Sequence, residues 1–157
     1  MIMIQRIQSL YLFLITLLTL IFIKGNFLSF SERTGSVINV SFNGIMRYNV
    51  GQGQEMVEKL LPLSVLIILI AAVSLITIFI FKNRKIQLWF SLLLVILAAV
   101  FVIALFHVSF RIVSKFDAGI IPGFKLILPI LILFFSILAN RGIRKDDKLV
   151  KSYDRLR

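Results

Sequence analysis

The sequence has no cysteine and a single histidine, His107, among its 157 residues. The absence of cysteine excludes disulfides, thiol catalysis, zinc–thiolate sites and iron–sulfur clusters. A single histidine without a second histidine or a methionine at helical spacing does not suit a haem site, and we expect His107 to be solvated at the end of a helix. The sequence therefore predicts no metal, no cofactor and no catalytic residues.

Acidic residues are also scarce, with seven against eighteen basic ones. General acid–base chemistry needs paired or desolvated carboxylates. Asp117 and the two glutamates Glu55 and Glu58 instead have Lys115 and Lys59 close in sequence, which favours exposed ion pairs. We therefore expect that this protein is not an enzyme.

Apolar residues, by contrast, make up 59% of the chain, and the mean hydropathy is +1.00. Most of them fall into four runs: Ile7–Ile23, Leu60–Phe81, Ile86–Phe106 and approximately Ala118–Ala139. A helix of about 20 apolar residues crosses the roughly 30 Å hydrocarbon core of a bilayer. The sequence thus predicts an all-α integral membrane protein, a single domain (1–157) built as a bundle of four transmembrane helices.

The basic residues are divided unevenly between the two sides of this predicted bundle. If the N-terminus lies inside, eleven basic residues fall on that side, in the turn 82–85, at Arg6 and in the tail 141–157, and seven fall on the other side. Basic residues concentrate on the cytoplasmic side of membrane proteins. We expect both termini in the cytoplasm. We also expect the first run to be an uncleaved helix, because Lys24–Phe27 offers no small-residue cleavage site for a signal peptidase.

The predicted outer loop, 24–59, carries a hairpin signal. Asn43-Gly44 separates the strand-like segments Val37–Phe42 and Ile45–Val50, and Asn-Gly favours a two-residue type I′ turn. Such a turn places Phe42 opposite Ile45 and Val40 opposite Arg47. The segment Phe27–Phe30 is a candidate third strand. We expect 51–54 to be a flexible connector and 55–59 a helical turn that leads into the second span.

The fourth run is irregular. Leu126–Ala139 alone is too short to cross upright, so the helix is expected to begin near Ala118, with Lys125 inside it and a kink at Pro129. The functional interpretation of Lys125 is a cation that binds a lipid headgroup or a partner's carboxylate. The alternative is a lysine that extends along its apolar stem to the interface.

The tail is basic, with a net charge of +4 over 141–157. Its apolar residues Leu149, Tyr153 and Leu156 share a helical face, which predicts a short amphipathic helix on the inner leaflet, bound to anionic lipid headgroups. Aromatic residues for base stacking are sparse, so we do not expect nucleic acid. The candidate contact residues for partners or lipids are Lys125, Arg144, Lys145, Lys148, Lys151 and Arg155.

Three segments resemble a known group of proteins: the opening Met3–Leu12, the turn Phe81–Gln87 and the ending Ala139–Arg157. In these segments the chain is similar to a family of small, uncharacterised four-helix inner-membrane proteins from Bacteroidota. The resemblance implies a bacterial inner membrane and four spans, and it implies no activity.

Two functions follow from these expectations. The first is a multi-pass inner-membrane protein that is a non-enzymatic subunit and binds other membrane proteins through its helix faces, hairpin and tail. The alternative is a small oligomeric transporter or channel, which requires polar or ionisable groups within the bundle. Apart from Lys125, the interiors of the predicted spans offer mainly serine and threonine for that purpose.

Overall fold

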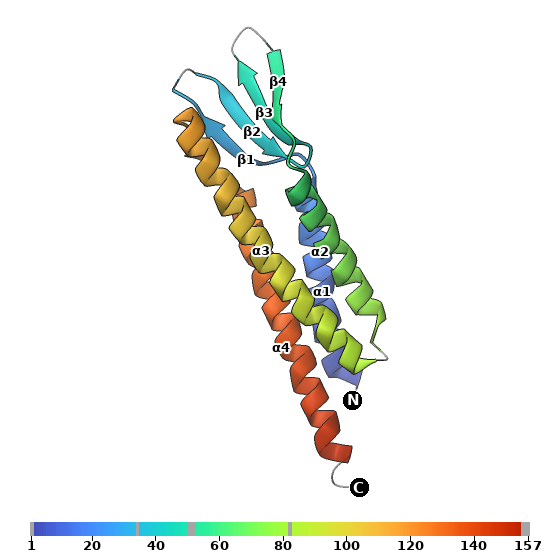
Figure 1. The fold of residues 1–157 in the computed structure, drawn as a ribbon. Coiled ribbons are helices and arrows are strands. Elements are labelled where there is room, and N and C mark those ends of the chain that lie inside the picture. The colour runs from blue at the N-terminus through green and yellow to red at the C-terminus, as the bar shows by residue number, and fades with distance from the viewer. Residues whose placement is uncertain (1, 34, 50–52, 82, 155–157) are drawn as a thin grey trace.

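The computed structural model describes residues 2–33, 35–49, 53–81 and 83–154. Four α-helices run side by side in these ranges, and a sheet of five strands covers one end of them (Figure 1). In chain order the elements are α1 (Ile2–Ile23), β1 (Asn26–Ser31), β2 (Val37–Ser41), β3 (Gly44–Asn49), β4 (Gly53–Glu58), α2 (Leu61–Phe79), α3 (Arg84–Phe116), β5 (Gly119–Ile121), the 3-10 helix η1 (Phe124–Ile127) and α4 (Leu128–Asp154).

The all-α prediction is wrong, because the chain combines helices with an antiparallel sheet in the order β4-β3-β2-β1-β5. β1 confirms the third strand that was predicted at Phe27–Phe30. β4 forms where a connector and a helical turn were expected, and β5 comes from the expected start of the fourth helix. A single hairpin is only marginally stable in water, and strands added on both sides extend its hydrogen bonding and its apolar face.

The hairpin β2–β3 forms, but its turn lies one residue earlier than predicted. Ser41 pairs with Gly44, so Phe42 and Asn43 make the turn, and neither has a positive φ. The predicted type I′ turn is therefore wrong. In the observed register Val40 lies opposite Ile45, and both are buried. Pairing two core-facing apolar side chains fixes the register more strongly than the local turn preference does.

Within the described residues three helices, rather than the four predicted, are long and apolar enough to cross a membrane, namely Leu61–Phe79, Arg84–Phe116 and Phe124–Lys148. The apolar part of α1 is the shorter segment Ile7–Ile23. α1 packs against α2 and α4, and α3 packs against the same two helices. The start of α1 and the end of α4 lie at the end opposite the sheet (Figure 1).

α3 extends well past its predicted end at Phe106. Its 33 residues make a rod of about 50 Å at 1.5 Å per residue, which is longer than the hydrocarbon core. The additional turns run beside the sheet, where Ile112 is buried and the guanidinium of Arg47 lies 5.8 Å from the ring centroid of Phe116. Asp117 ends the helix in the left-handed conformation, with φ 45°. α3 thus connects the helical layer to the sheet.

α4 begins at Leu128, and the prediction of a helix from near Ala118 is wrong. Pro129 falls in its first turn, where a missing N–H costs no helical hydrogen bond, so the predicted kink does not arise. The helix then continues to Asp154. The tail is therefore an extension of α4, and the expected separate helix on the membrane surface is also wrong.

Aromatic rings join the sheet to the helices. Phe22 of α1 stacks on Phe27 of β1 at 4.5 Å between ring centroids and meets Phe101 of α3 edge-on at 5.3 Å. Phe30 and Ile38, which pair across β1 and β2, are completely buried. Burial of such side chains stabilises the fold by about 1.5–3 kcal/mol each. These contacts therefore hold the sheet against the ends of the helices.

Candidate functional site

The residues proposed from the sequence lie at opposite ends of the molecule. Lys125 is in η1, which contacts β1 at the sheet end. Arg144, Lys145 and Lys148 lie on α4 past its apolar stretch Leu128–Ala139, at the other end. The structure therefore does not bring the candidate residues together into one site.

Lys125 is held at the junction between α1 and β1. Its Nζ donates a hydrogen bond to the backbone carbonyl of Lys24. Gly25 follows with φ +72°, and a Cβ there would stand 3.4 Å from the same Nζ. Because an ammonium has three donors, this bond leaves Lys125 able to bind an anionic group as well. Lys125 lies in η1, just before α4 begins, which is the position expected of a lysine at the membrane interface.

An apolar cavity of about 70 Å³ lies beside Lys125. Side chains from five elements line it, among them Phe22, Leu28, Leu105, Phe106, Leu126 and Ile130. Polar groups in its wall are few, with Ser109 and Lys125 the main ones. Such a cavity suits hydrocarbon rather than a polar ligand.

The basic residues of the tail project outward from α4. Arg144, Lys145 and Lys148 are exposed, while Ile143 and Asp146 on the other face of the same turns are buried. The side chain of Lys151 and the whole of Arg155 lie outside the described residues. The exposed cations form a charged face that is available to an anionic surface.

A cluster that the sequence did not predict lies at the end opposite the sheet. We name it the tail-end polar cluster: Gln8, Arg84, Gln87, Asn140 and Asp146. Gln8 Nε2 donates to Asp146 Oδ2 at 2.5 Å, and Arg84 Nη1 donates to the backbone oxygen of Asp146 at 3.3 Å. These bonds join α1 and α3 to α4.

Two amide side chains of the cluster connect α3 to α2 and to α4. Gln87 Nε2 donates to the Thr77 carbonyl oxygen at 3.3 Å, and Asn140 Nδ2 donates to Ser91 Oγ at 2.9 Å. The signal in the sequence was the spacing of Asn140, Ile143 and Asp146, which places them on one helical face. It was missed because the tail was interpreted as a separate surface helix.

A family model described as "Domain of unknown function (DUF4293)" matches residues 4–156. The chain belongs to this family. The match covers the sheet, all four helices and the tail-end polar cluster. Neither a curated protein nor a solved structure matches the chain. The description of the DUF4293 family states no activity, so any function must be argued from the structure.

Two of the carboxylates considered in the sequence of this DUF4293 chain, Asp117 and Glu58, form ion pairs, but not with the lysines expected from sequence. Asp117 Oδ2 lies 3.2 Å from Arg33 Nε, and Glu58 Oε2 lies 3.1 Å from Arg111 Nη2. Both pairs are substantially exposed. His107 is exposed as well, and the described residues hold no cluster of three or more residues suited to a metal ion.

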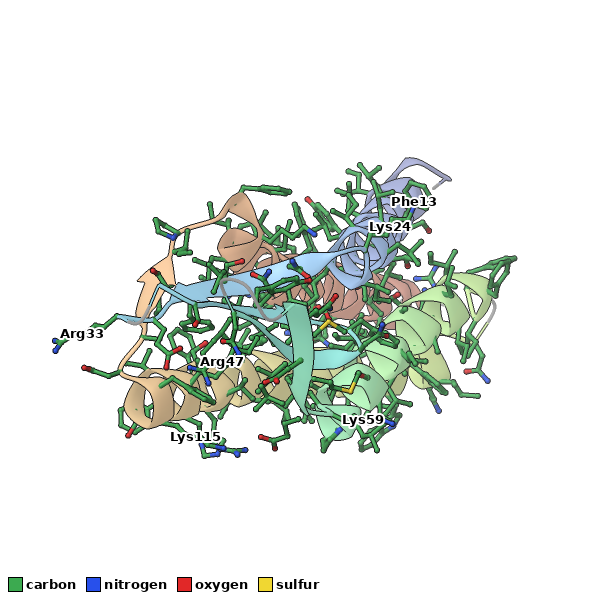
Figure 2. The ribbon with its side chains drawn as sticks, turned by 90° about the horizontal axis from the view of Figure 1, so that it is seen from above. Phe13, Lys24, Arg33, Arg47, Lys59 and Lys115 are labelled. Carbon is green, nitrogen blue, oxygen red and sulfur yellow. The ribbon has the colours of Figure 1, made fainter. Side chains whose placement is uncertain are left out.

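One ion pair at the sheet end is largely enclosed. Glu32 Oε2 accepts hydrogen bonds from Arg47 Nη2 at 2.5 Å and Nε at 3.1 Å, and the two side chains are 28% (Arg47) and 10% (Glu32) exposed. Figure 2 shows Arg47 between the sheet and α3, whereas Arg33 projects away from the molecule. Arg47 therefore has a structural role in attaching the sheet to α3.

Proposed function

We propose that this DUF4293 chain is a multi-pass protein of a bacterial inner membrane, with the sheet on the extracytoplasmic side and the tail in the cytoplasm. The resemblance to proteins of Bacteroidota supports this assignment. Three helices of sufficient length and apolarity support membrane insertion. The concentration of basic residues in the turn 82–85 and the tail supports the orientation.

We infer further that the protein is a non-enzymatic subunit that binds another membrane protein through the sheet. The observation that carries this is β4. It is the end strand in the sheet order, and five of its six residues are exposed. Met56 and Val57 are among them, at 52% and 36% exposure. An end strand offers backbone donors and acceptors to an extended segment of a partner.

The tail gives this subunit a second contact, with lipid. The exposed Arg144, Lys145 and Lys148 each contribute roughly 1 kcal/mol near an anionic surface. Together they favour anionic headgroups of the inner leaflet. We propose that Lys125, on the outer side, contacts a headgroup or a partner's carboxylate.

The experiment that tests the interaction is co-purification from native membranes in a mild detergent, with crosslinking and mass spectrometry. The double variant Met56→Lys/Val57→Lys places charge on β4. The matched control is Ile120→Lys/Ile121→Lys, which changes two exposed apolar residues of β5 at the opposite edge of the sheet.

The expected result is that the β4 variant loses a co-purifying membrane protein which the wild type and the β5 variant both retain. If both variants have the melting temperature of the wild type, their folding is unaffected. A wild-type chain that is a solitary monomer in every membrane preparation would refute the proposal. Equal loss in both variants would refute the assignment to β4.

A further inference from the structure

The tail-end polar cluster encloses a small pocket between α1, α3 and α4. Its volume is about 20 Å³, and its polar lining comes from Gln8, Ser9, Arg84, Gln87 and Asp146. A polar cavity needs about 10–15 Å³ to accommodate one water-sized group. The pocket therefore has room for one such group, between these polar side chains and the apolar Phe81 and Ile143.

Asp146 is the unusual member of this lining. It is only 8% exposed, and its Oδ2 accepts the bond from Gln8. Its Oδ1 is buried and has no hydrogen-bond partner within the part of the chain that the structure describes. A buried acceptor left without a donor is costly, and more so for a carboxylate than for a neutral group. The pocket that Asp146 lines is the adjacent space from which a donor could reach Oδ1 after a small shift of the side chains.

The position of Gln8 shows that the carboxylate is closely held. A Cβ on Gly142 would stand 2.9 Å from Gln8 Cγ, so the glycine is what lets the Gln8 side chain lie across α4 and reach Asp146. With Oδ2 fixed by this bond, Oδ1 has a defined direction. The acceptor is thus built into the helical packing.

A basic residue lines the same pocket as Asp146. The guanidinium of Arg84 lines the same pocket and uses one of its five N–H donors on the backbone oxygen of Asp146. The pocket thus presents an acceptor for a cation next to a donor for an anion. A ligand that complements both is a zwitterion whose two charges are a few bonds apart.

We propose that this pocket binds the headgroup of phosphatidylethanolamine. The primary ammonium donates to Asp146 Oδ1, and the phosphate lies against Arg84. The inference rests on the proposed membrane placement, in which the first residue of α3 and the start of the apolar part of α1 lie at the depth of inner-leaflet headgroups. Charge-assisted hydrogen bonds at both ends of the headgroup provide the affinity.

Size and donor chemistry distinguish this lipid from others. An ammonium is about as large as a water molecule and has N–H donors. The trimethylammonium of phosphatidylcholine has no N–H donor and exceeds the pocket. Phosphatidylglycerol offers a phosphate to Arg84 but no cation to Asp146.

The test is lipid retention by the full chain in nanodiscs that contain equal amounts of phosphatidylethanolamine, phosphatidylcholine and phosphatidylglycerol, measured by native mass spectrometry. The expected result is an enrichment of phosphatidylethanolamine over phosphatidylcholine of about tenfold, the factor that corresponds to one good polar interaction. Asp146→Asn should abolish the enrichment. The matched control Asp147→Asn, which removes the same charge from the next residue, should retain it.

A second series changes only the lipid, so it does not depend on how a variant folds. Retention by the wild type should fall as the ethanolamine nitrogen is methylated once, twice and three times. Equal retention across the series, or an enrichment that survives Asp146→Asn, overturns the proposal while the membrane placement stands. Failure of the chain to insert into the discs overturns both.

Discussion

At the scale of single residues, Gly44 is fixed by its neighbours rather than by a turn. It has φ +142°, and a Cβ there would collide with the backbone oxygen of Glu58 and stand 3.1 Å from Lys59 Cα. We predict that Gly44→Ala lowers the free energy of unfolding by more than the about 1–3 kcal/mol expected for a strained φ alone. Thermal unfolding in detergent measures the change.

Gly35→Ala is the control for Gly44, because Gly35 also has a positive φ, +85°, but nothing lies within 4 Å of its Cβ position. It isolates the conformational strain from the crowding. An equal loss of stability in the two variants would show that the close approach of β4 to Gly44 does not contribute to the change in the free energy of unfolding.

Arg47 and Arg33 allow a comparison of two ion pairs on one sheet. We predict that Arg47→Met lowers the free energy of unfolding by about 2 kcal/mol, because it leaves the enclosed carboxylate of Glu32 without its charged donor. Arg33→Met should change it little, since that pair is 85% and 76% exposed. The measurement is denaturant unfolding of both variants. A larger effect of Arg33→Met would contradict the structural role given to Arg47.

At the scale of elements, Pro129 marks where α4 begins. We predict that Pro129→Ala changes the stability by less than about 1 kcal/mol and leaves the helix content unchanged, because the proline occupies the first turn. A proline one turn further along, Leu133→Pro, removes an internal hydrogen bond and should cost about 3 kcal/mol or more. Circular dichroism and thermal unfolding test both. A gain in helix content for Pro129→Ala would instead support the predicted kink at Pro129.

For the whole molecule, the prediction concerns orientation. The chain has no cysteine, so single substitutions give a background-free test. Gln54 on β4 and Lys145 on α4 are both exposed, at opposite ends. We predict that Gln54→Cys is labelled by an impermeant thiol reagent in intact bacteria, and Lys145→Cys only after the membrane is opened. The reverse pattern, or labelling of both in intact cells, would refute the proposed orientation.

Composition and periodicity were enough to predict the apolar segments, the strand-like character of 37–50 and the absence of thiol chemistry, because these are local properties of the chain. It located the helices but misjudged where α3 ends and α4 begins. Local patterns do not show that Gly119–Ile121 pairs with Ser29–Ser31, a contact between segments far apart in the chain.

The five-stranded sheet and the tail-end polar cluster depend on contacts between segments that are distant in the chain. The hairpin register follows from the pairing of Val40 with Ile45 over the helix ends, which outweighs the turn preference of Asn43-Gly44. Asp146 in sequence is one charge in a basic tail. It becomes a buried acceptor because Gly142 admits Gln8 and Arg84 reaches its backbone oxygen. Burial and long-range hydrogen bonds are properties of packing between helices, and no single segment carries them.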